Sequence, residues 1–172
     1  MKSLIAFLLF SLVLGSAPAV AAPLRPGLKP EASLAFFGIT FIDTSAEGAY
    51  FDARPDEAAR LAMVSDYVIG QFKERGFRFL DVEPVREEID RIANPADCND
   101  CEVRMARKLG ADYSLVGQIQ KVSNLILSMN LVIRDAETGA MARGMSVDIR
   151  GNTDDSWRRG MRYILRNNIF KE

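Results

Sequence analysis

The sequence predicts a single α/β domain of the α+β type, in which a mixed β-sheet and helices form three layers in the element order βαβααβββα. Three observations predict this class. Apolar and β-branched residues dominate residues 34–42, apolar residues recur at helical spacing between Leu61 and Phe72, and apolar and polar residues alternate over residues 125–134. Because three successive strands follow a strand-helix-strand unit, we expect parallel pairing first and an antiparallel meander after it.

The first 21 residues have the pattern of a secretory signal peptide. Lys2 precedes an apolar run over residues 4–14, and small residues then end in Ala21. We therefore expect cleavage near Ala21 and a periplasmic protein. Residues 22–33 contain three prolines, which predicts an extended leader, and the folded domain should cover residues 34–170.

The first half of the domain should be one crossover unit. Residues 34–42 are almost all apolar, which indicates a central strand that is buried on both faces. A helix should run over residues 55–75, with proline and two carboxylates in its first turn and Gly76 at its end. Residues 77–82 should then form a strand parallel to the first one.

The second half should contain two short helices, a meander and a closing helix. Pro84 opens a helix that ends near residue 92, and residues 101–109 form a second helix that Gly110 terminates. Thr153 caps a last helix over residues 156–168. Between them, alternation predicts three antiparallel strands over residues 113–122, 124–134 and 141–150.

The composition excludes several function classes. The 172-residue chain has 22 basic and 23 acidic residues, a balance that argues against nucleic acid as the partner. It contains no histidine, so the commonest general base, the Ser-His and Cys-His nucleophile pairs and every histidine metal site are missing. We therefore expect no catalytic residues and no cofactor, and we interpret the chain as a protein that is not an enzyme.

Cys98 and Cys101 are the two cysteines of the chain, three residues apart at the start of a predicted helix. In an oxidising compartment this spacing permits a structural disulfide, and the helix N-terminus also permits a thiol-disulfide exchange pair. The acidic neighbours Asp97, Asp100 and Glu102 oppose a thiolate. A zinc site would lack ligands, so we expect no metal, and Glu102 stands where covalent haem attachment needs a histidine.

The last predicted helix is amphipathic and basic. Its basic residues are Arg158, Arg159, Arg162 and Arg166, while apolar residues line the other side. The simpler interpretation is a helix that packs on the sheet and exposes a solvated basic face. The functional interpretation is a docking surface for an acidic protein, or for peripheral contact with an anionic membrane surface.

A polar loop follows the first strand at the edge where open α/β sheets tend to bind ligands. Asp43, Thr44, Ser45 and Tyr50 could contribute contacts to a ligand there. No glycine pattern for phosphate binding accompanies them, so an ordinary loop is the alternative.

Two resemblances to known families add to this reading. Residues 109–117 and 135–139, with the order of elements, resemble bacterial envelope domains that include the N-terminal domain of the Tol-system propeller protein and the curli secretion lipoprotein. Residues 98–101, 120–124 and 148–159 resemble a family of secreted proteobacterial proteins known only as a domain of unknown function. The second resemblance brings no catalytic residues, and it implies an accessory role beside periplasmic quinoprotein dehydrogenases.

Two main hypotheses of function follow, and a structural subunit of an envelope assembly is a third possibility. The first is a non-enzymatic periplasmic binding or accessory protein that docks a protein partner of the cell envelope or of a periplasmic quinoprotein system. The alternative is a thiol-disulfide redox factor that acts through Cys98 and Cys101.

Overall fold

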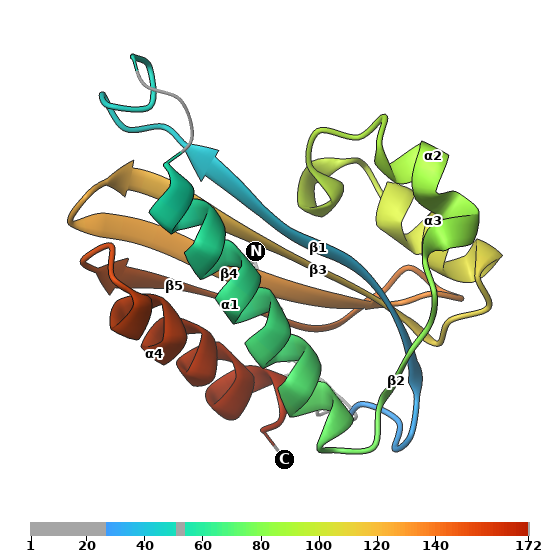
Figure 1. Ribbon diagram of the computed structural model, residues 1–172. Helices are drawn as coiled ribbons and strands as arrows, with labels where there is room; N and C mark the ends of the chain where they lie inside the picture. Colours follow the sequence, from blue (N-terminus) through green and yellow to red (C-terminus); the bar gives the residue numbers. More distant parts are fainter. Residues whose placement is uncertain (1–26, 51–53, 172) are drawn as a thin grey trace, which may run out of the picture.

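A five-stranded mixed sheet forms the centre of the computed structural model, which describes residues 27–50 and 54–171 (Figure 1). The strand order is β2-β1-β3-β4-β5. β1 pairs in parallel with β2 and β3, whereas β3, β4 and β5 form an antiparallel meander, as predicted. The strands are β1 (Ser33–Asp43), β2 (Arg78–Phe79), β3 (Tyr113–Ser123), β4 (Ile126–Asp135) and β5 (Met141–Arg150).

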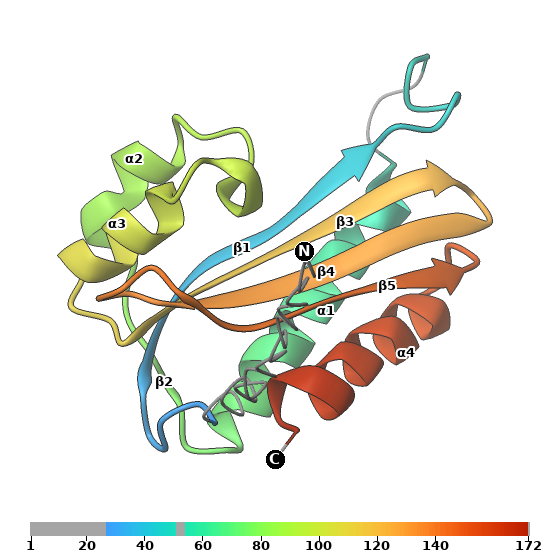
Figure 2. The same cartoon turned by 180° about the vertical axis from the view of Figure 1, so that it is seen from behind.

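Two long helices cover one face of the sheet (Figures 1 and 2). They are α1 (Pro55–Lys73) and α4 (Asp154–Ile164), and one turn of π-helix, η3 (Leu165–Ile169), continues α4. The main core lies between these helices and the sheet, because the apolar face of each helix packs against inward-facing strand residues. Val68, Phe72, Leu115 and Trp157 are fully buried there.

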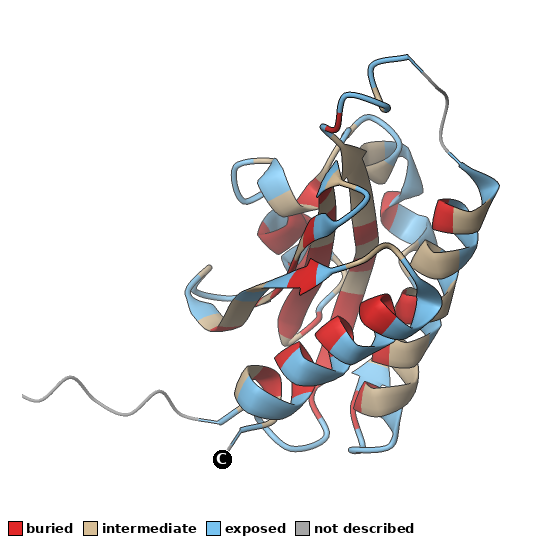
Figure 3. Cartoon of the chain, turned by 90° about the vertical axis from the view of Figure 1, so that its left-hand side faces the viewer, coloured by how far each residue is buried: buried red, intermediate tan, exposed pale blue. Residues whose placement is uncertain are grey.

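A smaller helical layer covers part of the opposite face, beside β1 and β3. It contains η1 (Glu83–Val85), α2 (Arg86–Ile89), η2 (Pro95–Asp97) and α3 (Cys101–Lys108). Its core joins Met105 and Ala106 of α3 to Ala35, Phe37 and Val116 of the sheet. The burial pattern thus has apolar residues on both faces of the sheet (Figure 3), which confirms the predicted mixed-sheet α+β class.

Several elements differ from the prediction in extent or in position. The second strand has two residues, because only Ser33 and Leu34 of β1 find partners there. The last helix begins at Asp154, where a reciprocal capping box joins Thr153 and Ser156. β1 lies one position from the middle of the sheet, and β3 is the central strand.

The start of the described chain contacts the domain. Leu28 packs against the main core, and the backbone N–H of Lys29 donates to the hydroxyl of Tyr113 at 3.2 Å. The predicted signal peptide and the first part of the predicted leader lie outside the described residues. Within the described residues, no helix is long and apolar enough to span a membrane.

Candidate functional site

β5 is an edge strand, and in the described part of the chain it pairs with β4 alone. Antiparallel partners alternate between hydrogen-bonded and non-hydrogen-bonded pairs. Because the N–H of Gly151 donates to the carbonyl of Leu125 at 3.0 Å, the next pair, Arg150 with Ile126, is non-hydrogen-bonded. The same alternation directs the backbone groups of Asp148 and Ser146 away from β4. The outer side of β5 therefore offers backbone donors and acceptors.

Helix α4 is held tightly beside this edge (Figure 2). A Cβ on Gly160 would lie 2.6 Å from Cγ2 of Ile149 and 2.7 Å from Sδ of Met129, so only glycine permits this approach. Trp157 stacks on Phe41 with ring centroids 5.7 Å apart. These contacts fix the orientation of α4, and the opposite side of the helix carries its arginines into solvent.

A groove of about 600 Å³ lies between β5 and α4. Residues 145–150 of β5 form one wall, while α4 contributes Ser156, Arg159, Gly160 and Tyr163. An adjoining hollow of about 350 Å³ continues along α4, lined by Arg159, Arg162, Tyr163, Arg166 and Asn167. We call the two together the basic groove.

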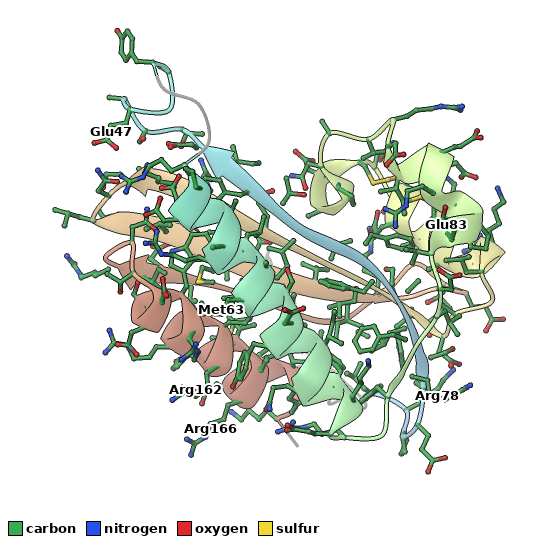
Figure 4. All side chains as sticks on the ribbon, in the orientation of Figure 1. Glu47, Met63, Arg78, Glu83, Arg162 and Arg166 are labelled. Atoms are coloured by element: carbon green, nitrogen blue, oxygen red, sulfur yellow. A yellow bond between two sulfur atoms is a disulfide. The ribbon has the colours of Figure 1, made fainter. Side chains whose placement is uncertain are left out.

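The predicted basic set divides between two flanks of α4. Arg162 and Arg166 extend outward from the helix (Figure 4) and form no salt bridge with the described residues, and Arg159 pairs with Asp155 at 3.3 Å. Arg158 lies on the flank that faces α1, where its Nη2 is 3.1 Å from Sδ of Met63. Three of the four arginines therefore line the basic groove and one does not.

The predicted ligand loop is only partly assembled. Oδ1 of Asp43 accepts hydrogen bonds from the backbone N–H and the hydroxyl of Ser45, at 2.9 and 2.5 Å. The hydroxyl of Thr44 donates to the carbonyl of Lys121 at 3.1 Å. Tyr50 is 84% exposed and does not join them. The polar groups of Asp43, Thr44 and Ser45 are thus engaged within the protein.

Lys121 is the central residue of this region, although no local pattern of residues predicts this. Its side chain is 1% exposed, and Nζ lies 3.0 Å from Oδ2 of Asp43 and 3.0 Å from Oε1 of Glu57. Glu47 is 3.6 Å away, and Nδ2 of Asn152 donates to Glu57 at 2.6 Å. We call Lys121, Asp43, Glu47, Glu57 and Asn152 the lysine cluster.

The charges of the lysine cluster stabilise one another. Burial lowers the pKa of Lys121, but the hydrogen bonds to Asp43 and Glu57 outweigh it, so the pKa is raised. Burial raises the pKa of Asp43, yet the hydrogen bonds from Ser45 and Lys121 bring it below its ordinary value. Both shifts favour the charged forms, and the cluster joins β1, β3 and α1 as a structural unit.

Cys98 and Cys101 form a disulfide with their Cα atoms 5.5 Å apart. Sγ of Cys98 lies 3.3 Å from Oε2 of Glu102, which is buried. Nη1 of Arg134 donates to the other oxygen of Glu102 at 3.2 Å and also pairs with Asp100. The bridge is thus held beside a carboxylate, which opposes formation of a thiolate.

A metal site does not fit this arrangement. Donor atoms of Cys98, Cys101 and Glu102 lie within 4.8 Å of one another. The disulfide occupies both sulfurs, and Arg134 engages the carboxylate of Glu102. Since a thiolate is the form that binds metal, the oxidised pair has no free ligand to offer.

The fold and the groove define an α+β domain with an open edge strand beside a basic helix. Residues 32–169 match the family DUF3280, described as "Protein of unknown function (DUF2380)", and the chain belongs to this family. This confirms the expected membership in an uncharacterised family. No curated protein matches the chain in sequence.

Several solved structures are similar to the chain at low sequence identity. The LpoB C-terminal domain from Salmonella enterica has a TM-score of 0.49 and 12% identity, covering 72% of this chain and 85% of that chain. Lipoprotein GNA1162 from Neisseria meningitidis has a TM-score of 0.48 and 16% identity, covering 72% and 83%. The PelC dodecamer from Paraburkholderia phytofirmans has a TM-score of 0.48 and 12% identity, covering 83% and 91%. The resemblance to the Tol-system and curli proteins stays a prediction.

Proposed function

We propose that this chain is a non-enzymatic accessory protein of the bacterial cell envelope, which binds a protein partner through the basic groove. The observation that carries the proposal is the open edge of β5 beside three outward arginines of one helix face. Arginine is enriched at protein interfaces and holds carboxylates through two parallel hydrogen bonds.

The chemistry of the groove supports binding rather than catalysis. Arg159, Arg162 and Arg166 present guanidinium groups, whose N–H donors match the two oxygens of a carboxylate. Lys121 and Asp43, which lie outside the groove, are paired with each other at 3.0 Å. The groove therefore offers fixed positive charge and an accessible strand edge.

The periplasm is the location we propose, on the basis of the signal-peptide pattern in the first 21 residues. One candidate partner in the periplasm is a component of a quinoprotein dehydrogenase system. An anionic membrane surface would also attract the arginines, and vesicles that contain phosphatidylglycerol separate this outcome from protein binding.

The proposal is tested by capture from periplasmic extract with Arg162→Glu, with Arg158→Glu as the matched control. Both changes reverse one charge on an exposed arginine of α4, but only Arg162 lines the basic groove. We expect wild type and Arg158→Glu to capture a partner protein that Arg162→Glu does not capture. Equal capture by all three would contradict the proposal, and so would binding to the vesicles without any captured protein.

The redox alternative rests on the Cys98–Cys101 disulfide at the start of α3. It is examined by thiol labelling across a series of glutathione redox buffers. A structural bridge should stay oxidised until strongly reducing conditions, and the double serine variant should still capture the partner. Loss of capture in that variant, with its fold intact, would favour the redox alternative.

A further inference from the structure

The outer edge of β5 has the geometry of a site for strand addition. The backbone groups of Ser146, Asp148 and Arg150 point away from β4, as the hydrogen bond from Gly151 to Leu125 implies. The basic groove runs along these same residues. An extended peptide laid there could continue the ladder, since main-chain hydrogen bonds at a sheet edge require no particular sequence.

We propose that an extended acidic segment of the partner occupies the basic groove and pairs with β5 as a sixth strand. This inference rests on the proposed function, and it adds the conformation and the charge of the segment that binds.

Charge decides which segment fits. The basic groove carries four arginines and has two acidic residues in or beside it. The arginines are Arg150, Arg159, Arg162 and Arg166, and the acidic residues are Asp148 and Asp155, which pairs with Arg159. The surplus of positive charge favours carboxylates on the incoming chain and disfavours lysine or arginine.

The spacing of α4 matches an extended chain. Side chains on one face of a strand repeat about every 6.8 Å. Arg162 near the end of α4 and Arg166 in η3 are four residues apart, which at the α-helical rise is about 6 Å along the axis. Every second side chain of an added strand would face α4. Acidic residues at alternate positions could therefore reach successive arginines, with Tyr163 between them as an apolar contact that is 52% exposed.

A second copy of this chain is a poorer occupant. Pairing β5 with β5 of another copy would bring the arginines of both α4 helices to one interface, where like charges repel. An acidic segment removes that repulsion and gains the same backbone hydrogen bonds.

The test uses a labelled ten-residue peptide of alternating glutamate and threonine, and measures its affinity by fluorescence anisotropy. Two control peptides have the same length. In one, lysine replaces glutamate; in the other, every backbone amide is methylated, which keeps the charge but removes the donors. We expect the first peptide to bind and both controls to bind at least about tenfold more weakly.

Two protein variants locate the binding. Ser146→Pro removes an outward N–H and is compatible with an edge strand, whereas Ser146→Thr keeps it. Arg162→Glu and Ser146→Pro should each weaken the glutamate peptide about tenfold, while Ser146→Thr and Arg158→Glu should not. If Ser146→Pro fails to fold, hydrogen exchange of wild type replaces it, and the amides of residues 146 and 148 should exchange more slowly with peptide bound.

The outcomes separate this inference from the proposed function. Strand addition is overturned if the methylated peptide binds as tightly as the unmethylated one. It is also overturned if no peptide binds while partner capture still depends on Arg162. In both cases the proposed function still holds. Strand addition by a partner is also overturned if ultracentrifugation shows a wild-type dimer that Ser146→Pro dissociates, because a second copy of the chain then occupies the edge. Partner capture that is independent of Arg162 removes the proposed function itself.

Discussion

At the scale of single residues, the lysine cluster shows how a buried charge is accommodated. Lys121 has almost no exposure, yet two carboxylates lie within 3.0 Å of Nζ. Removing one partner of such a buried pair lowers the free energy of unfolding by more than the intact pair contributes to it, because the remaining charge stays desolvated. The cluster therefore specifies how α1 docks on β1 and β3.

Replacing Lys121 with methionine should lower the free energy of unfolding by about 3–5 kcal/mol, since Glu57 then stays buried without its cation. The buried side chain of Glu57 is only 2% exposed. The double variant with Glu57→Gln should lose less than the sum of the two single variants. Urea denaturation of the four proteins measures this coupling, and strict additivity would show that the two residues act independently.

The pKa of Asp43 predicts a specific dependence on pH. Its folded-state pKa is lowered, so its contribution to stability is present above an unfolded pKa of about 4 and is lost as pH falls through the folded value. Lys121 has a raised pKa, so its contribution persists up to about pH 10.5 and is lost above it.

Asp43→Asn should therefore be less stable than wild type at neutral pH, and the two stability curves should converge as the pH falls toward 3. Chemical denaturation at intervals between pH 3 and 7 measures both curves. A constant difference across this range would show that the charge of Asp43 does not contribute.

Only part of the site could be predicted from residues alone. The arginines of α4 were found because helical spacing is a local property. Lys121 was missed because its partners Asp43 and Glu57 are distant in sequence, and nothing near it distinguishes a buried lysine from a solvated one. The separation of Arg158 from the groove depends on contact with Met63 of α1, which is also a tertiary property.

At the scale of elements, the close packing of α4 on β5 and β4 depends on Gly160. The order of elements and the antiparallel meander followed from periodicity. The two-residue length of β2 did not, because pairing with β1 rather than local pattern decides where a strand ends. The close approach at Gly160 is likewise invisible in the sequence, where a glycine inside a helix indicates only lower helix propensity.

Gly160→Ala tests this close packing, with Gly70→Ala in α1 as the control. Alanine gains about 1 kcal/mol of helix propensity at either site. At Gly160 the new Cβ meets Ile149 and Met129 below 2.8 Å, whereas at Gly70 nothing lies within 4 Å. Overpacking costs about 1–3 kcal/mol, so Gly160→Ala should lower the thermal midpoint and Gly70→Ala should raise it. A stabilised Gly160→Ala would show that α4 can move away from β5.

At the scale of the whole molecule, the structure presents two candidate surfaces in different places. The basic groove lies between β5 and α4, and the loop with Tyr50 follows β1 near the lysine cluster. The groove has outward charge and backbone groups of β5 that no other described strand pairs with, while the polar residues of the loop are engaged internally. We therefore propose the groove, and not the loop, as the binding surface.

Site-specific photocrosslinking in cells tests this assignment most directly. A photoreactive phenylalanine analogue would replace Tyr163 in one variant and Tyr50 in the other, two exposed tyrosines at 52% and 84%. We expect a covalent protein adduct at position 163 that Arg162→Glu reduces, and none at position 50. An adduct at position 50 with none at position 163 would contradict it.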